Sequence, residues 1–180
     1  MAAGDVCVRF QNAPAPERNG RLLRAASEGR SGGNPGGIGV HPVSNVSGTA
    51  NTDGSFPNVT RNVVRGINPA GQLWVIAELK AAVKTDGSIR VNGRGLLLAG
   101  GNNIGTNATA RVFATLICEP APLFVERSTD LAGVALEPNG DFKIDDILSP
   151  APRGCASPVL LIRSAGNLTW FAAGIQKLED

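Results

Sequence analysis

The sequence contains a single histidine, His41, and any catalytic pairing of serine or cysteine with histidine would depend on it. A serine or cysteine nucleophile at neutral pH needs a base within hydrogen-bond reach, and this base is usually a histidine. The nearest serine is Ser44, but positions 41 and 44 of an extended segment point to opposite faces. We therefore expect His41 to be an ordinary residue before Pro42, and we expect no hydrolytic nucleophile.

Acidic side chains gather around Asp141 and Asp145, which share one face if the segment is extended. Carboxylate oxygens are the ligands that Ca²⁺ prefers, but the spacing lacks the central glycine and closing glutamate of an EF-hand loop. Asp141 and Asp145 are candidates for calcium ligation, although polarity at the mouth of a hairpin explains them more simply. We expect no resident metal and no cofactor.

A glycine- and asparagine-rich loop runs from Gly100 to Asn107. Such loops bind phosphate when they open a helix after a strand, but residues 108–118 read as a strand and the loop holds no lysine. A long connection between strands is the simplest interpretation. If the loop is instead the rim of a ligand site, its candidate binding residues are Asn102, Asn103, Thr106 and Asn107.

The two tryptophans, Trp74 and Trp170, lie in apolar strand patterns, and the chain has no tyrosine. Proteins that stack sugars or single-stranded nucleic acids do so on exposed aromatic side chains. We expect both indoles to pack in the core.

The three cysteines, Cys7, Cys118 and Cys155, form no C-x-x-C motif, so the pattern gives no support to a zinc or thioredoxin-type site. Cys118 ends one strand pattern and Cys155 precedes another, which is compatible with a disulfide between them. No apolar stretch is long enough to span a bilayer, and Met1–Gly4 has neither the charged start nor the apolar run of a signal peptide. The protein is either secreted and bridged or intracellular with reduced thiols.

These residues must be positioned by strands, and the clearest strand signal is a hairpin from Leu79 to Val91. Apolar and polar residues alternate on both sides of a three-residue loop that ends at Gly87. A type I turn closed by a glycine bulge places Val83 opposite Ile89 on the apolar face, whereas a two-residue loop would break that face. The same pattern returns around Pro138-Asn139-Gly140, and it predicts Leu136 opposite Phe142 and Val134 opposite Ile144.

Glycine and proline together make up 35 of the 180 residues and charged residues only 18%, which is typical of a turn-rich β-protein. The fold class that we predict is all-β, an antiparallel β-sandwich or a small closed β-barrel. Residues 1–37 are expected to be a flexible N-terminal arm, and 38–180 a single β domain. Strands are predicted near 38–46, 60–67, 72–84, 88–99, 108–118, 122–128, 131–137, 141–148, 158–164 and 168–176.

Charge is distributed unevenly between the arm and the body. Residues 1–37 carry five arginines and three acidic residues, whereas the remaining chain carries 12 basic and 12 acidic residues. A body without net charge has no field that would attract nucleic acid, so we expect no nucleic-acid partner.

Part of the chain resembles a group of small secreted bacterial β-proteins that have two cysteines in comparable places and no assigned function. The resemblance covers about residues 60–177 and implies secretion and a Cys118–Cys155 bridge. It rests on Leu73-Trp74-Val75-Ile76, the Asp86-Gly87 turn, the strand ending at Cys118, Pro138-Asn139-Gly140-Asp141, Cys155-Ala156-Ser157-Pro158-Val159-Leu160 and Trp170-Phe171-Ala172.

Two functions remain open at this point. The first is a non-enzymatic extracellular binding or structural module that acts through a surface patch, a sheet edge or a loop rim. The alternative is a small-molecule-binding β-barrel with isomerase- or cyclase-type activity, because such barrels act through shape and a few polar groups. The expected partner is a protein or a small-molecule ligand, and self-association through a sheet edge or the N-terminal arm is compatible with the pattern.

Overall fold

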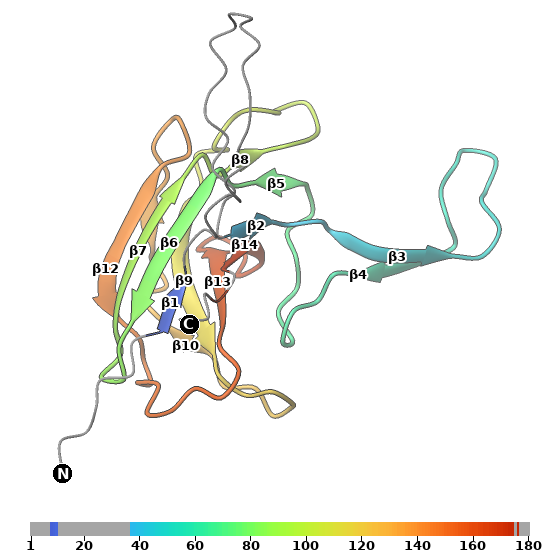
Figure 1. Cartoon of the computed structure of the whole chain (residues 1–180). Coiled ribbons are helices and arrows are strands. Elements are labelled where there is room, and N and C mark those ends of the chain that lie inside the picture. The colour runs from blue at the N-terminus through green and yellow to red at the C-terminus, as the bar shows by residue number, and fades with distance from the viewer. Residues whose placement is uncertain (1–7, 11–36, 175, 177–180) are drawn as a thin grey trace, which may run out of the picture.

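The computed structural model describes residues 8–10, 37–174 and 176 (Figure 1). In this part of the chain every regular element is a β-strand, and the strands form several antiparallel sheets, none of which closes into a barrel. The predicted all-β class is therefore confirmed. None of the described residues belongs to a helix long and apolar enough to cross a membrane.

Sheet A has four strands in the order β1-β6-β7-β12. Burial alternates along its three longer strands because successive side chains of a strand point to opposite faces. One face is buried and the other meets solvent, as is usual for antiparallel sheets. The strands are β1 (Val8–Phe10), β6 (Glu78–Val83), β7 (Ser88–Arg94) and β12 (Phe142–Ile147).

Sheet B follows the order β10-β9-β13-β14-β2, and a further short strand, β11, also pairs with β9. Its strands come from three distant parts of the sequence, namely β2, β9 to β11, and β13 with β14, so the sheet joins segments from both ends of the described chain. The strands are β2 (Gly37–Gly39), β9 (Arg111–Ile117), β10 (Arg127–Ser128), β11 (Val134–Ala135), β13 (Val159–Ser164) and β14 (Trp170–Gly174).

The centre of sheet B is buried on both faces. In β9, six consecutive residues, 112–117, are fully buried, and in β13 the five residues 160–164 are buried as well. The apolar run at the start of β13 predicts such a strand, and the structure confirms it. One continuous cluster of buried side chains contains residues of both sheets, including Leu79 and Val91 from sheet A and Leu116 and Ile162 from sheet B.

Two further sheets have two strands each. The first is a hairpin of β3 (Val43–Ser47) and β4 (Asn58–Arg61), and the second pairs β5 (Trp74–Val75) with β8 (Leu97–Leu98).

The hairpin of β6 and β7 has the predicted register. Val83 pairs with Ile89, Ala81 pairs with Val91, and the turn residue Gly87 has a φ angle of 95°. Only glycine adopts this left-handed backbone without strain, which is why the loop ends there.

The second predicted turn also forms. Gly140 has a φ angle of 81°, and its N–H donates to the carbonyl of Glu137 at 2.8 Å. The N–H of Glu137 donates to the carbonyl of Asp141 at 2.9 Å and closes the turn.

The strand pairing predicted around this second turn is wrong. Val134 pairs with β9 in sheet B, whereas Ile144 pairs with β7 in sheet A. Phe142 likewise pairs with β7 and not with Leu136. The chain changes sheet at the turn because β12 forms six residue pairs with β7, which leaves β11 to extend β9.

Three predicted strands are interrupted. The segment 72–84 divides into β5 and β6, and 88–99 divides into β7 and β8, because Gly95 has a φ angle of 64° and turns the chain out of sheet A. The segment 38–46 divides into β2 and β3 at Pro42, whose ring nitrogen has no hydrogen to donate.

The predicted arm, 1–37, is described only in part. Val8–Phe10 forms β1 and pairs with β6, in register with Val8 opposite Val83, and Gly37 already belongs to β2. Residues 1–7, including Cys7, and 11–36 lie outside the described residues. The division into arm and body stays a prediction.

Gly93 of β7 is expected to be irreplaceable, because its missing side chain makes room for a ring. Gly93 pairs with Phe142, and a Cβ atom at Gly93 would overlap the Cε1 and Cζ atoms of Phe142. Gly93→Ala should lower the free energy of unfolding by about 1–3 kcal/mol, as overpacking of a core does. Urea denaturation measures the change.

Gly71→Ala is the matched control, because a Cβ atom there has no neighbour within 4 Å. Equal urea midpoints for the two variants would contradict the packing argument.

Candidate functional site

The β3–β4 hairpin extends away from the two large sheets (Figure 1). Among the described strands, β3 and β4 pair only with each other, and all of their residues are exposed. Each strand therefore has one edge whose backbone N–H and C=O groups face solvent. Such an edge is a template for pairing with another extended chain.

One face of the hairpin is apolar. Val46 and Val59 are directly opposite each other, with exposed fractions of 41% and 53%, and Phe56 in the connecting loop is 38% exposed. Natural proteins usually protect an exposed strand edge with charged residues, especially lysine. Here the only charged residue between His41 and Arg61 is Asp53, so the edges have little such protection.

The tip of the hairpin is held by its own hydrogen bonds. Asp53 Oδ1 accepts hydrogen bonds from the Ser55 hydroxyl at 2.7 Å and from the Ser55 N–H at 2.9 Å, and these bonds lower the pKa of Asp53. Asn51 Nδ2 donates to Ser55 Oγ at 2.9 Å. The loop therefore has a defined shape.

The base of the hairpin is anchored to the body. Trp170 Nε1 donates to the carbonyl of Asn62 at 3.1 Å, and Arg61 Nη2 donates to the carbonyl of Pro69 at 2.8 Å. The N–H of Asn62 donates to the carbonyl of Pro42 at 3.1 Å, which joins the two strands where they leave the body.

An apolar pocket of about 290 Å³ opens at the end of the core where β6 meets the loop before β13. Its walls come from the β6 end, from β9 and from the disulfide-linked loop, so three parts of the chain build it. The lining residues are Val83, Lys84, Thr85, Leu116, Pro152, Arg153, Gly154 and Cys155.

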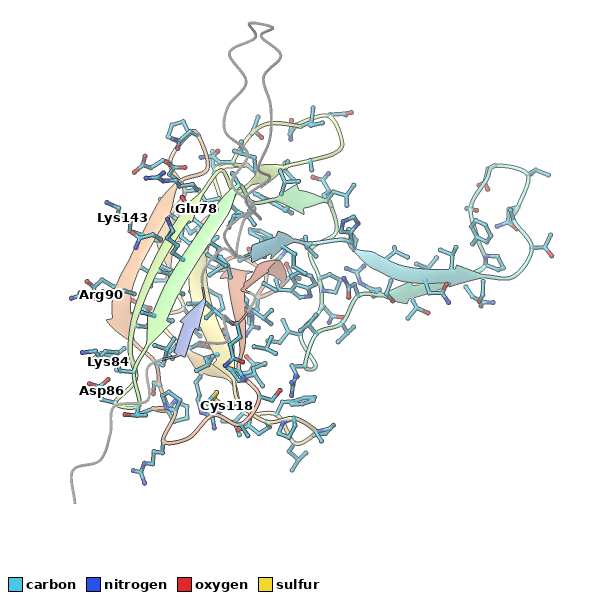
Figure 2. All side chains as sticks on the ribbon, in the orientation of Figure 1. Glu78, Lys84, Asp86, Arg90, Cys118 and Lys143 are labelled. Carbon is cyan, nitrogen blue, oxygen red and sulfur yellow. A yellow bond between two sulfur atoms is a disulfide. The ribbon has the colours of Figure 1, made fainter. Side chains whose placement is uncertain are left out.

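The outer face of sheet A is charged and carries both signs. Figure 2 shows Lys84, Arg90 and Lys143 pointing away from the sheet. Arg90 Nε lies 3.1 Å from Asp145 Oδ2, and both side chains are more than 70% exposed. Exposed pairs of this kind contribute at most about 1 kcal/mol. This face is a solvated surface with two hollows of about 640 and 470 Å³.

The four residues predicted as a ligand rim lie in the loop between β8 and β9. Asn107 has a structural role, because its Nδ2 donates to the carbonyls of Leu136 at 3.0 Å and of Glu137 at 2.9 Å. Thr106 Oγ1 donates to the carbonyl of Asn103 at 2.8 Å within the loop. Asn102 is exposed beside them, and none of the four lines a pocket described here.

The two calcium candidates each have a partner of their own. Asp141 Oδ1 accepts a hydrogen bond from the Gly95 N–H at 3.0 Å, and Asp145 pairs with Arg90. Among the described residues there is no group of three or more histidine, cysteine or acidic side chains placed to hold a metal ion. Asp141 and Asp145 therefore remain calcium candidates on the sequence alone.

The predicted disulfide between Cys118 and Cys155 is present, with an S–S distance of 2.05 Å. Both tryptophans are buried, as expected, and Trp74 stacks on Phe171 with ring centroids 4.1 Å apart. His41 is exposed on the connection between β2 and β3.

Glu119, next to the disulfide, forms a bidentate interaction with Arg127. Arg127 Nη2 donates to Glu119 Oε1 at 2.8 Å and Arg127 Nη1 donates to Oε2 at 3.3 Å, while the Val125 N–H also donates to Oε2 at 3.1 Å. The hydrogen bond from Arg127 is the main reason why the pKa of Glu119 falls from 4.5 to about 2. This contact closes the loop between β9 and β10.

Arg163 on β13 is buried, with 5% of its surface exposed, and it has several partners. Its Nη1 donates to Glu126 Oε2 at 2.5 Å and to Thr115 Oγ1 at 3.2 Å, and its Nε donates to the carbonyl of Leu168 at 2.9 Å. The guanidinium also lies over the ring of Phe113 at 5.2 Å. We interpret this group as structural, because a buried charge must be paired and hydrogen-bonded.

The hairpin and the pocket were not identified as sites from the sequence. The run from Pro42 to Thr60, with Asp53 as its only charged residue and with Val46 and Val59 around a loop, is a signal for an exposed hairpin. No comparable signal exists for the pocket, because Val83, Leu116 and Gly154 are far apart in the sequence.

A comparison with known protein families, curated proteins and solved structures finds no match for this chain.

The Glu119–Arg127 contact should make stability depend on acid pH. A carboxyl whose pKa is lower in the folded protein stabilises the fold fully above its ordinary value of 4.5 and loses this effect as the pH falls through about 2. Glu119→Gln should therefore destabilise the protein at neutral pH, and its difference from wild type should shrink between those two values. Urea unfolding at a series of pH values measures this.

Glu137→Gln, at an exposed glutamate, is the control. A Glu119→Gln deficit of constant size across the acid range would show that the lost interaction does not depend on the carboxylate charge.

Proposed function

We propose that this protein is a non-enzymatic binding and structural module whose docking element is the β3–β4 hairpin. An extended strand of another polypeptide adds to an edge of the hairpin and continues its hydrogen-bonded ladder. The observation that carries the proposal is that β3 and β4 form an exposed two-stranded sheet with an apolar face and a single charge from Pro42 to Thr60.

The energetics of a lone hairpin support this role. A two-stranded sheet is at best marginally stable in water, whereas three or more strands with an apolar face are stable. Pairing with a further strand satisfies the free backbone groups of one edge. It also reduces the exposure of the cross-strand pair of Val46 and Val59.

The partner to which we commit is a second copy of the chain. Two hairpins related by a two-fold axis present the same edge to each other, so one surface serves both subunits. Charge repulsion does not oppose this pairing, because Asp53 is the only charged side chain between Pro42 and Thr60 and it lies at the tip.

The arrangement of potentially reactive side chains favours binding over catalysis. His41 is exposed, and Asp141 and Asp145 are engaged by separate partners. An enclosed cavity in the core would favour the alternative function, a small-molecule-binding barrel with isomerase or cyclase activity. The pocket of about 290 Å³ instead opens at one end of the core cluster.

We further propose that sheets A and B pack face to face as a β-sandwich and that the protein works outside the cytosol. One core cluster draws on both sheets, which supports the sandwich. The disulfide supports an oxidising compartment, in agreement with the resemblance to small secreted bacterial β-proteins.

The docking proposal predicts self-association that depends on the hairpin. Sedimentation velocity of the full chain should give a concentration-dependent dimer between micromolar and near-millimolar protein. The double variant Val46→Lys/Val59→Glu should stay monomeric, because it charges the apolar face while its opposite charges still form a favourable cross-strand pair.

Leu123→Lys is the control, because Leu123 is 90% exposed but does not belong to the hairpin. A wild-type monomer at all concentrations, or a dimer that survives in the double variant, would be the result that disproves docking through the hairpin.

A further inference from the structure

The pocket at the end of the core combines an apolar interior with a cationic mouth. Val83, Leu116, Pro152 and Cys155 supply the apolar part of its lining. Lys84 and Arg153 are its two charged lining residues, and no acidic residue belongs to the lining. Ligand sites in proteins are typically concave and apolar with a few polar groups that set orientation.

The charge at the mouth is positive but not fully isolated. Asp86 lies close enough to Lys84 for the ammonium charge to help lower the pKa of Asp86, after the larger effect of its hydrogen bonds from Ser88. Figure 2 shows Lys84 pointing outward from sheet A, away from the core, so Arg153 is the cation on which the site depends. Among the described residues, neither Lys84 nor Arg153 has an acidic partner within 4 Å.

The size of the pocket limits the ligand. A volume of about 290 Å³ is at the lower end of the range for ligand sites. At about 30 Å³ for each water-sized group, it holds on the order of ten non-hydrogen atoms. A linear carboxylate of eight carbons has this size.

We propose that this pocket binds a small amphipathic anion, with its hydrocarbon part against the apolar lining and its carboxylate at the mouth beside Arg153. The hydrocarbon gains from leaving water, and the carboxylate stays at the solvated mouth, where a cation attracts it and no desolvation is required. This site is separate from the β3–β4 hairpin, so it does not depend on the proposed function.

The wall that contains Arg153 is held in place covalently. The residues 152–155 that line the pocket end at Cys155, whose disulfide with Cys118 fixes this loop beside the end of β9. The loop also contacts the first hairpin, since the N–H of Leu148 donates to the carbonyl of Gly87 at 2.8 Å. The pocket therefore exists before a ligand arrives, which reduces the entropy lost on binding.

Calorimetric titration of the full-length, oxidised protein tests the ligand class with three probes of equal length: octanoate, octan-1-ol and octylammonium. We expect octanoate to bind at one site, octanol to bind roughly two- to fivefold more weakly, and octylammonium more weakly still. A factor of this size corresponds to one solvent-exposed ionic contact. Equal or tighter binding of octylammonium, or no binding of octanoate, would overturn the proposal.

Two kinds of variant locate the site. Arg153→Gln should weaken octanoate roughly two- to fivefold and leave octanol unchanged, since only the charge at the mouth is lost. Gly154→Leu should weaken binding of both ligands, because Gly154 belongs to the lining, and the fold should tolerate it, because a Cβ atom there meets no other atom within 4 Å. Gly71→Leu, at another glycine with open space, should bind as the wild type does.

Methyl NMR of the wild-type protein gives a result that does not depend on any variant. Octanoate should shift the methyl signals of Val83 and Leu116 and leave those of Leu98, which does not line the pocket, in place. Shifts confined to other methyl groups, or full octanoate binding by a folded Gly154→Leu protein, would place the ligand elsewhere and refute the assignment.

Discussion

The burial of β9 and β13 on both faces is the constraint on which the rest of the structure depends. Side chains alternate between the two faces of a strand, so six successive buried residues in β9 require cover on each side. Sheet A supplies apolar partners on one side, since both sheets contribute to one core cluster. The other side is covered by irregular segments, and this explains why a chain with so many glycines and prolines has a large buried interior.

Covering a sheet with loops buries polar groups, and each of these needs a partner. Arg163 projects from the middle of sheet B and is neutralised by Glu126, and Thr115 beside it shares a hydrogen bond of 2.9 Å with Ser128. At the end of β9, the contact between Glu119 and Arg127 joins the two ends of the loop between β9 and β10. The disulfide ties Cys118, where this loop begins, to Cys155. A buried ion pair adds little net stability, but loss of one partner leaves an expensive unpaired charge.

The same constraint determines which surfaces remain available for binding. Strand β14 of sheet B anchors the base of the β3–β4 hairpin through the bond from Trp170 to Asn62, while the strands of the hairpin extend beyond the body. The pocket opens where the cover of the core ends, between the first hairpin and the loop tied to Cys118. Both surfaces are by-products of how one two-faced sheet is enclosed, and both are separate from the residues whose types alone suggested chemistry.

The sequence by itself determined the strand character, the register of the first hairpin and both glycine turns, because these depend on alternation and on backbone conformations that neighbouring residues set. Val83 meets Ile89 for this local reason. Tertiary structure alone decided that Val134 pairs with β9 and Ile144 with β7, since a free strand edge accepts any extended partner and the competition between partners is settled by the whole fold. The pocket is decided in the same way, because Leu116 and Gly154 become neighbours only when distant segments pack together.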